Sequence, residues 1–148
     1  MTEKELNEKK KEYLKSYRFI SNRINSLELQ IEELRESKEQ AKSQQITDMP
    51  SGNKQTDLSD YIVKLERLEE KAIKKCDERK KQKIEIESTI LDVQDDIESD
   101  ILYKRYISLM EWDDIAESIG YCTRQILRYH GQALHNMKFD CDDVTPCH

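Results

Sequence analysis

The sequence predicts an all-α fold, in which a long antiparallel helical hairpin of coiled-coil type is followed by a C-terminal helix-turn-helix. The 148 residues include only three glycines and two prolines, and 38% of them are Asp, Glu, Lys or Arg. This composition is typical of long helices and argues against a turn-rich sheet fold. The apolar fraction of 36% is low for a globular core, but it suffices for the narrow seam between paired helices.

The first predicted helix covers residues 4–42. Its apolar and aromatic residues alternate between spacings of four and three, at Tyr13, Tyr17, Ile20, Ile24, Leu27, Ile31 and Leu34. Unbroken heptads of this kind indicate a coiled coil. The remaining positions are mostly charged or polar, so we interpret the run Lys9-Lys10-Lys11, which has acidic neighbours, as part of a solvated face.

A flexible loop is expected at residues 43–57 (SQQITDMPSGNKQTD), because this polar stretch holds one of the two prolines and one of the three glycines. The second helix begins near Leu58, with Ser59 as its candidate N-cap. Its apolar positions are Leu65, Leu68, Ala72, Cys76, Ile86, Ile90, Val93 and Ile97, and Arg79 and Lys83 interrupt the seam. Each helix would be about 57 Å long, so the second can fold back on the first. An intermolecular bundle built from the same seams is the alternative.

Three domains are expected: the hairpin at residues 1–95, the helix-turn-helix at 96–138 and a disordered acidic tail at 139–148. Acidic residues cluster at 95–100, where Asp96 or Ser99 is expected to cap a helix over residues 100–109. The inward residues of that helix are Ile101, Leu102, Tyr106 and Ile107. Two further helices are predicted at about 112–119 and 123–137, and the apolar side of the last one is extended by Leu127, Leu134 and Met137.

The most informative motif is WDDIAESIGYCTRQILRYHG at residues 112–131. Counted from Trp112, Ala116 is the fifth residue, Gly120 the ninth and Ile126 the fifteenth. A small residue is needed where two helices cross closely, and glycine suits the left-handed turn between them. A β-branched residue then packs the second helix onto the first. Such a unit lays its second helix in the major groove of DNA, so the sequence predicts a DNA-binding module.

Candidate DNA contacts follow from that placement, because the first turns of a recognition helix face base edges and phosphates. Arg124 and Arg128 are the main candidates, since arginine can donate two hydrogen bonds to guanine. Gln125 suits adenine, and Thr123 suits a phosphate near the helix N-terminus. Further candidates are His130 and Gln132 on the same helix, and Lys104 and Arg105 on the preceding one. The alternative is that the two arginines, four residues apart, only solvate an exposed face.

The C-terminal residues resemble region four of bacterial sigma factors. The matching pattern is Leu102-x-x-Arg105-Tyr106-Ile107, Trp112-x-x-Ile115-Ala116-x-x-Ile119-Gly120 and Arg124-x-x-x-Arg128-x-x-x-x-Ala133-Leu134. In that fold a preceding helix braces the motif, and the recognition helix reads the −35 promoter element. The whole chain also resembles the small RinA-type transcription activators of phages and prophages. This resemblance implies a regulator of phage late or packaging genes that binds promoter DNA in the cytoplasm of a bacterial host cell.

One position departs from the usual pattern of such motifs. A serine often caps the recognition helix at the eleventh position, where this chain has Cys122, and a thiol is a poor cap. Gln125 stands where a capping box would place it. Thr123 is the alternative cap, which would move the start of the helix by one residue and change which side chains face the bases.

Charge and cysteine content restrict the remaining functions. The net charge of −6 counts against nucleic-acid binding, but the stretch from Cys122 to Lys138 contains three basic residues, two histidines and no acid. Cys141, Cys147 and His148 could touch one metal ion, but we interpret them as part of a frayed terminus and expect no metal and no cofactor. The chain has no glycine-rich phosphate loop and no apolar run of membrane-spanning length. We therefore expect neither an enzyme nor a membrane protein.

Two other functions stay open at this point. A DNA-packaging adaptor similar to a small terminase subunit would also join a helix-turn-helix to coiled-coil helices, but it would assemble as a ring. A coiled-coil interaction protein would need no DNA contact at all. Because an isolated motif makes few DNA contacts, a further partner beside double-stranded DNA is expected, either RNA polymerase or a second copy of the chain held as a homodimer by the coiled coil.

Overall fold

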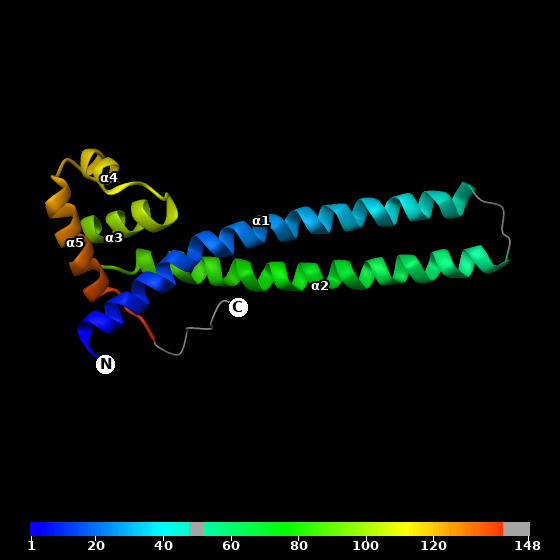
Figure 1. Ribbon diagram of the computed structural model, residues 1–148, viewed down its shortest axis with the longest axis horizontal. Helices are drawn as coiled ribbons and strands as arrows, with labels where there is room; N and C mark the ends of the chain where they lie inside the picture. The colour runs from blue at the N-terminus through cyan, green and yellow to red at the C-terminus, as the bar shows by residue number, and fades with distance from the viewer. Residues whose placement is uncertain (48–51, 141–148) are drawn as a thin grey trace. The chain divides into compact units, whose positions relative to one another are not determined.

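The computed structural model describes residues 1–47 and 52–140. Within these ranges the chain forms five α-helices and one short π-helical segment, and no β-strand (Figure 1). The prediction of an all-α fold is therefore confirmed. The elements are α1 (Glu3–Thr47), α2 (Gly52–Leu91), α3 (Asp96–Leu102), the π-helix η1 (Tyr103–Ile107), α4 (Trp112–Ile119) and α5 (Thr123–Asn136).

Helical backbone covers most of the stretch that was expected to be a loop. α1 continues to Thr47 and α2 already begins at Gly52, so the expectation of a loop over all of residues 43–57 is wrong. Residues 43–47 contain neither glycine nor proline, and extending an existing helix costs far less than nucleating a new one. The rest of that expectation, at residues 48–51, lies outside the described residues.

The chain divides into two compact units. We call Asn22–Lys80 the central unit, and we call Met1–Ser21 together with residues 81–140 the terminal unit. The start of α1 and the end of α2 therefore belong with the three C-terminal helices. This division differs from the boundary expected at residue 95.

Within the central unit, α1 and α2 run in opposite directions. The Lys80 ammonium lies 3.2 Å from a Glu28 carboxylate oxygen, and the Glu69 carboxylate binds Arg35 and Lys38, each at 2.8 Å. Glu28, earlier in α1, thus meets Lys80 of α2, whereas Arg35 and Lys38, later in α1, meet the earlier residue Glu69 of α2. The directions of the two helices follow from these ion pairs.

The apolar seam of the central unit uses most of the heptad positions read from the sequence. Its buried residues are Ile24, Leu27, Ile31, Ala41, Ile62, Leu65, Ala72 and Cys76. Leu34 is only half-buried, and Leu68 is 50% exposed. The expectation that Leu68 belongs to the buried seam is therefore wrong, because Leu65 and Ala72 occupy the buried positions on either side of it.

In the terminal unit, the start of α1 packs beside the end of α2. The buried residues of this pair are Leu14, Tyr17, Ile20, Ile86 and Ile90, and Val93 is buried just after the end of α2. The Tyr17 hydroxyl donates to Glu87 Oε1 at 2.7 Å, and burial together with that carboxylate raises the pKa of Tyr17 to about 12. Lys83, which was expected to interrupt the seam, places its ammonium 5.7 Å from the centre of the Tyr17 ring, within the range of a cation–π contact.

The three C-terminal helices share a core of branched apolar side chains. The fully or nearly fully buried members of this core are Ile101, Ile115, Ala116 and Ile126. α3 begins at Asp96, earlier than the expected residue 100, because the Asp95 carboxylate accepts a hydrogen bond from the Glu98 backbone N–H at 3.0 Å. Neither Asp96 nor Ser99 is the N-cap, and the Ser99 hydroxyl instead donates to the Ile90 carbonyl at 2.9 Å.

A π-helical turn replaces the second half of the α-helix expected at residues 100–109. The Ser108 N–H donates to the Tyr103 carbonyl at 3.1 Å, and the Met110 N–H donates to the Lys104 carbonyl at 3.0 Å. The next residue after Ser108, Leu109, has a φ of 57°, a left-handed conformation that costs about 1–2 kcal/mol for a residue with a side chain. The chain reverses at this point and leads into α4.

Candidate nucleic-acid interface

A tight turn connects α4 and α5. Gly120 ends α4 with a φ of 88°, and the N–H groups of Gly120 and Tyr121 donate to the Ala116 carbonyl at 2.9 and 3.1 Å. A Cβ atom at position 120 would meet no atom within 4 Å. The backbone conformation, and not lack of space, is therefore the reason for glycine here.

The other two motif positions hold the helices together. Ala116 is 5% exposed and Ile126 is fully buried, and both pack with Ile101 of α3 in one core. α3 thus lies against the pair of helices, as a bracing helix would. The small residue, the glycine and the β-branched residue each have the role that their spacing predicted.

One face of α5 is exposed and carries four of the eight candidate contacts. Arg124, Gln125, Arg128 and Gln132 are all exposed. The two arginines make no hydrogen bond or ion pair with any residue of the described chain. Since residues three, four and seven apart share a helix face, Arg124 and Arg128 present two unpaired guanidinium groups on adjacent turns.

The first turn of α5 lacks a side-chain cap. Cys122 is the N-cap residue but its thiol caps no N–H group, and it lies 3.9 Å from Gln125 Oε1. The helix begins at Thr123, whose hydroxyl donates to Asp113 Oδ1 of α4 at 2.8 Å. The Thr123 hydroxyl is thus occupied in holding the two helices together, which weakens its expected role as a phosphate donor.

His130 is not part of the exposed face, so its assignment as a DNA contact is wrong. It is 7% exposed, its Nε2 lies 2.8 Å from the Tyr106 hydroxyl, and the Trp112 ring meets it edge-on with a centroid distance of 4.7 Å. Burial, with smaller contributions from Lys11, Arg105 and Lys15, lowers the pKa of His130 to about 4. A neutral, buried imidazole that is hydrogen-bonded to a tyrosine has a structural role.

The two candidates on the bracing segment are held by their neighbours. The Lys104 ammonium lies 3.0 Å from Asp100 Oδ2 and 3.2 Å from Ser118 Oγ. The Arg105 guanidinium lies 4.4 Å from the centre of the Trp112 ring and donates to the Met110 carbonyl at 3.0 Å. Lys104 and Arg105 therefore stabilise the connection between η1 and α4, and contacts of these side chains to a nucleic acid would compete with those interactions.

The sequence pattern missed two exposed residues on α5. Leu127, which was expected to extend the apolar side, is 47% exposed and lies three residues after Arg124, on the adjacent part of the same face. Gly131 follows one turn later, in the helix interior, with no atom within 4 Å of where its Cβ would be. Glycine at such a position destabilises a helix by about 1 kcal/mol relative to alanine, and no neighbour among the described residues requires it. A glycine does, however, let another molecule approach the backbone closely.

Lys10 connects α1 to the end of α5. Its ammonium donates to the carbonyls of Leu134 and His135 at 2.6 and 3.4 Å, and the side chain is 5% exposed. Burial lowers the pKa of Lys10. The expectation that residues 9–11 are solvated is thus wrong for Lys10, which neutralises the negative end of the α5 dipole. No local pattern marks this contact, because its partners lie more than a hundred residues away along the chain.

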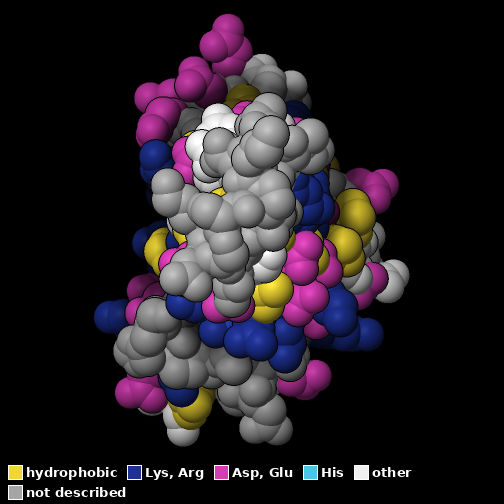
Figure 2. All heavy atoms as spheres, turned by 90° about the vertical axis from the view of Figure 1, so that its right-hand side faces the viewer, with side chains coloured by type: hydrophobic (Ala, Val, Ile, Leu, Met, Phe, Trp, Pro, Cys, Tyr) yellow, Lys and Arg dark blue, Asp and Glu magenta, His cyan; other side chains and the backbone are white. Residues whose placement is uncertain are grey.

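Acidic side chains border this face on the preceding helix. Asp113, Asp114 and Glu117 of α4 are exposed, whereas α5 has no acidic residue. Figure 2, which is drawn from the side where α1 ends and α2 begins, shows described Lys and Arg side chains interspersed with Asp and Glu. The exposed side of α5 differs from that mixed surface, because its candidate contacts include two arginines and no acidic residue.

Comparisons with protein-family models, with curated proteins and with solved structures gave no match. None of the helices in the described ranges combines the length and apolar character that a membrane span requires. The described residues also contain no group of three or more His, Cys, Asp or Glu side chains placed to hold a metal ion. The tail residues Cys141, Cys147 and His148 lie outside the described part of the chain.

Proposed function

We propose that this chain is a sequence-specific DNA-binding transcription regulator of phage or prophage genes, of the RinA type. In this proposal α4, the Gly120 turn and α5 form a helix-turn-helix like that of sigma region four, and α3 with η1 braces it. The antiparallel pair of α1 and α2 forms the accompanying helical hairpin. The observation that supports the proposal best is the pair of unpaired, exposed arginines on α5, which follows a left-handed turn at Gly120 and is joined to α4 by the packing of Ala116 and Ile126 in one core.

The face of α5 suggests how DNA would be read. Arg124 and Arg128 would each donate two hydrogen bonds to guanine or bind phosphate, and Gln125 would bind adenine. Leu127 would contact the methyl group of a thymine, and Gly131 would let α5 enter the major groove deeply. The acidic side chains of α4 would stay away from the phosphates, which limits the orientations in which α5 can enter the groove.

The first experiment selects binding sites for the full-length protein from a random pool of duplex DNA. We expect an enriched motif that the double variant Arg124→Ala/Arg128→Ala loses, because each arginine would contribute about 1–3 kcal/mol of discrimination. The matched control is Arg18→Ala/Arg67→Ala, which removes the same charge from exposed positions on α1 and α2. Wild-type protein that enriches no motif, or a motif that survives in the Arg124/Arg128 variant, would contradict the proposal.

A further inference from the structure

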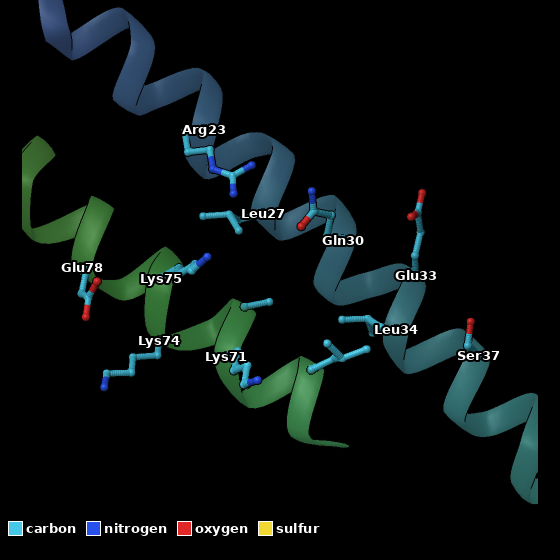
Figure 3. Close-up of a pocket in the computed structure, with 12 residues that line it drawn as sticks. Arg23, Leu27, Gln30, Glu33, Leu34, Ser37, Lys71, Lys74, Lys75 and Glu78 are labelled. Carbon is cyan, nitrogen blue, oxygen red and sulfur yellow. The ribbon is translucent and has the colours of Figure 1, made fainter. Parts of the chain in front are cut away.

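A groove runs between α1 and α2 within the central unit, on one side of the buried seam. It has a volume of about 710 Å³, and its apolar residues are Leu27 and Leu34 from α1 and Leu68 and Ala72 from α2. Figure 3 shows Leu27 and Leu34 directed from α1 toward α2. Leu68 is 50% exposed and Leu34 is only half-buried, so the groove leaves apolar surface in contact with water.

The exposed apolar surface continues along α2. Leu58, Tyr61, Leu65, Leu68 and Ala72 follow one another at alternating spacings of three and four, the pattern of an apolar stripe on a helix. Leu65 and Ala72 are buried in the seam, but Tyr61 and Leu68, one heptad apart, are each 50% exposed. α2 therefore carries a wider apolar face than α1 covers.

The rim of this groove is rich in unpaired cations. Arg23, Lys71, Lys74 and Lys75 line it, together with the two carboxylates of Glu33 and Glu78. None of these four cations forms an ion pair with a described residue. In Figure 3, Arg23 and Lys75 are directed into the space between the helices, whereas Glu33 is directed away from α2.

On the other side of the same helix pair, the charged residues are mostly acidic. There a smaller groove of about 480 Å³ is lined by Glu28, Glu32, Asp77, Arg35 and Lys80 with the apolar residues Ile31, Ile73 and Cys76. Its two cations are already paired, Lys80 with Glu28 and Arg35 with Glu69. Unpaired positive charge beside exposed apolar surface thus distinguishes the groove that contains Leu68.

We propose that the Leu68 groove binds an amphipathic helix of a partner protein, whose apolar residues recur at heptad spacing and are flanked by Asp and Glu. An amphipathic helix laid in an apolar groove is a recurrent way for helical proteins to recognise a partner. The partner's apolar side chains cover Leu34, Leu68 and Tyr61, and its carboxylates pair with the cations of the rim. A second copy of this chain, related by a two-fold axis, would instead place two identical grooves against each other, each with four cations and only two carboxylates, so that both sides carry an excess of positive charge.

The proposal does not depend on DNA binding, because the groove shares no residue with the exposed face of α5. The test uses the full-length protein and two labelled synthetic helical peptides of equal length. Both peptides carry leucine at the heptad core positions; one has glutamate at the flanking positions and the other has lysine. Fluorescence anisotropy measures the affinity of each peptide near physiological salt, where screening still permits short-range charge contacts.

We expect the glutamate peptide to bind at least about tenfold more tightly than the lysine peptide. The triple variant Lys71→Glu/Lys74→Glu/Lys75→Glu should reverse this preference, and Leu68→Ser should weaken the binding of the glutamate peptide. The control Lys15→Glu/Arg18→Glu/Lys42→Glu makes the same change in charge on exposed residues outside the groove, and it should keep the preference. Circular dichroism confirms that each variant has retained its helices.

Three results would overturn the proposal. One is equal affinity for the two peptides, and another is the absence of binding by either peptide. The third is concentration-dependent self-association of the wild-type protein in sedimentation experiments that Leu68→Ser abolishes, because a second copy would then be the occupant of the groove.

Discussion

At the scale of single residues, the described part of the terminal unit buries three polar or charged residues, Lys10, Glu98 and His130, and two of them are of a type that often binds nucleic acid. His130 is hydrogen-bonded to Tyr106 and packed against Trp112, and Lys10 binds carbonyl groups at the end of α5. Both residue types are usually exposed when they bind nucleic acid. Here each forms a hydrogen bond with a buried polar group, and removal of either side chain would leave that group without its hydrogen-bond partner.

The buried histidine makes stability depend on pH. Its pKa is about 4 in the folded protein and about 6.5 in an unfolded chain. Above pH 6.5 His130 is neutral in both states and adds no pH dependence. As the pH falls from 6.5 to 4, only the unfolded state takes up the proton, so the free energy of unfolding should decrease by a total on the order of 3 kcal/mol.

Urea unfolding at a series of pH values between 7 and 4, each followed by circular dichroism, would measure this effect. The comparison protein is the variant His130→Gln, which cannot titrate and should lose less stability over the same interval. The acidic groups of the protein are shared by both forms, so the difference between the two slopes isolates the histidine. Parallel slopes would show that His130 does not control this part of the acid sensitivity.

At the scale of helices, α5 contains features that its own stability does not require. Its exposed face holds Leu127 and Gly131 between polar residues, and its N-cap residue Cys122 caps no N–H group with its side chain. A helix selected for stability alone would have alanine or a charged residue at position 131. We interpret these departures as adaptations to a surface that binds α5 from outside.

Two glycine variants separate stability from function. Gly131→Ala should raise the free energy of unfolding by about 1 kcal/mol, because the added methyl group meets only open space, yet it should weaken binding to the selected DNA by keeping α5 away from the groove. Gly120→Ala should instead lower stability by about 1–2 kcal/mol, since the residue has a φ of 88°. Unfolding curves and DNA titrations with the same preparations provide both measurements. If Gly131→Ala binds DNA as tightly as wild-type protein, close approach at that position plays no part.

At the scale of the whole molecule, residues from both ends of the chain build one unit. Met1–Ser21 belongs to the same unit as α3, α4 and α5, and Glu3 Oε1 lies 2.8 Å from His135 Nδ1, close to the contacts of Lys10. The C-terminal helices are therefore stabilised by the first turns of α1. A change near the N-terminus should therefore alter the stability of the unit that contains α5, although the two are distant in sequence.

This expectation can be tested with neighbouring lysines. Lys10→Met removes the ammonium from the end of α5 and should lower the free energy of unfolding by about 1–2 kcal/mol. The control Lys9→Met alters an exposed side chain and should change stability by no more than about 0.5 kcal/mol. Denaturant unfolding followed by circular dichroism distinguishes the two variants. Equal stabilities for both would mean that the contact between Lys10 and α5 contributes nothing measurable.

The sequence alone predicted the features that depend on local periodicity. Few glycines and prolines, with heptad spacing from Tyr13 to Leu34, predicted long helices, because the periodicity of a helix face appears directly in neighbouring residues. The spacing of Ala116, Gly120 and Ile126 likewise predicted a tight turn between two packed helices. The exposed residues Arg124, Gln125, Arg128 and Gln132 also follow from this spacing, since a helix that buries Ile126 must expose the opposite side.

Only the tertiary structure decided which side chains are buried by residues distant in sequence. Nothing in the neighbouring sequence distinguishes Lys10 from exposed lysines, and it is buried because the end of α5 covers it. His130 is likewise buried because Tyr106 and Trp112 pack against it. Leu68 has the spacing of a core residue, but α1 does not cover that side of α2. Burial at these positions depends on contacts across the fold, which a pattern of neighbouring residues does not contain.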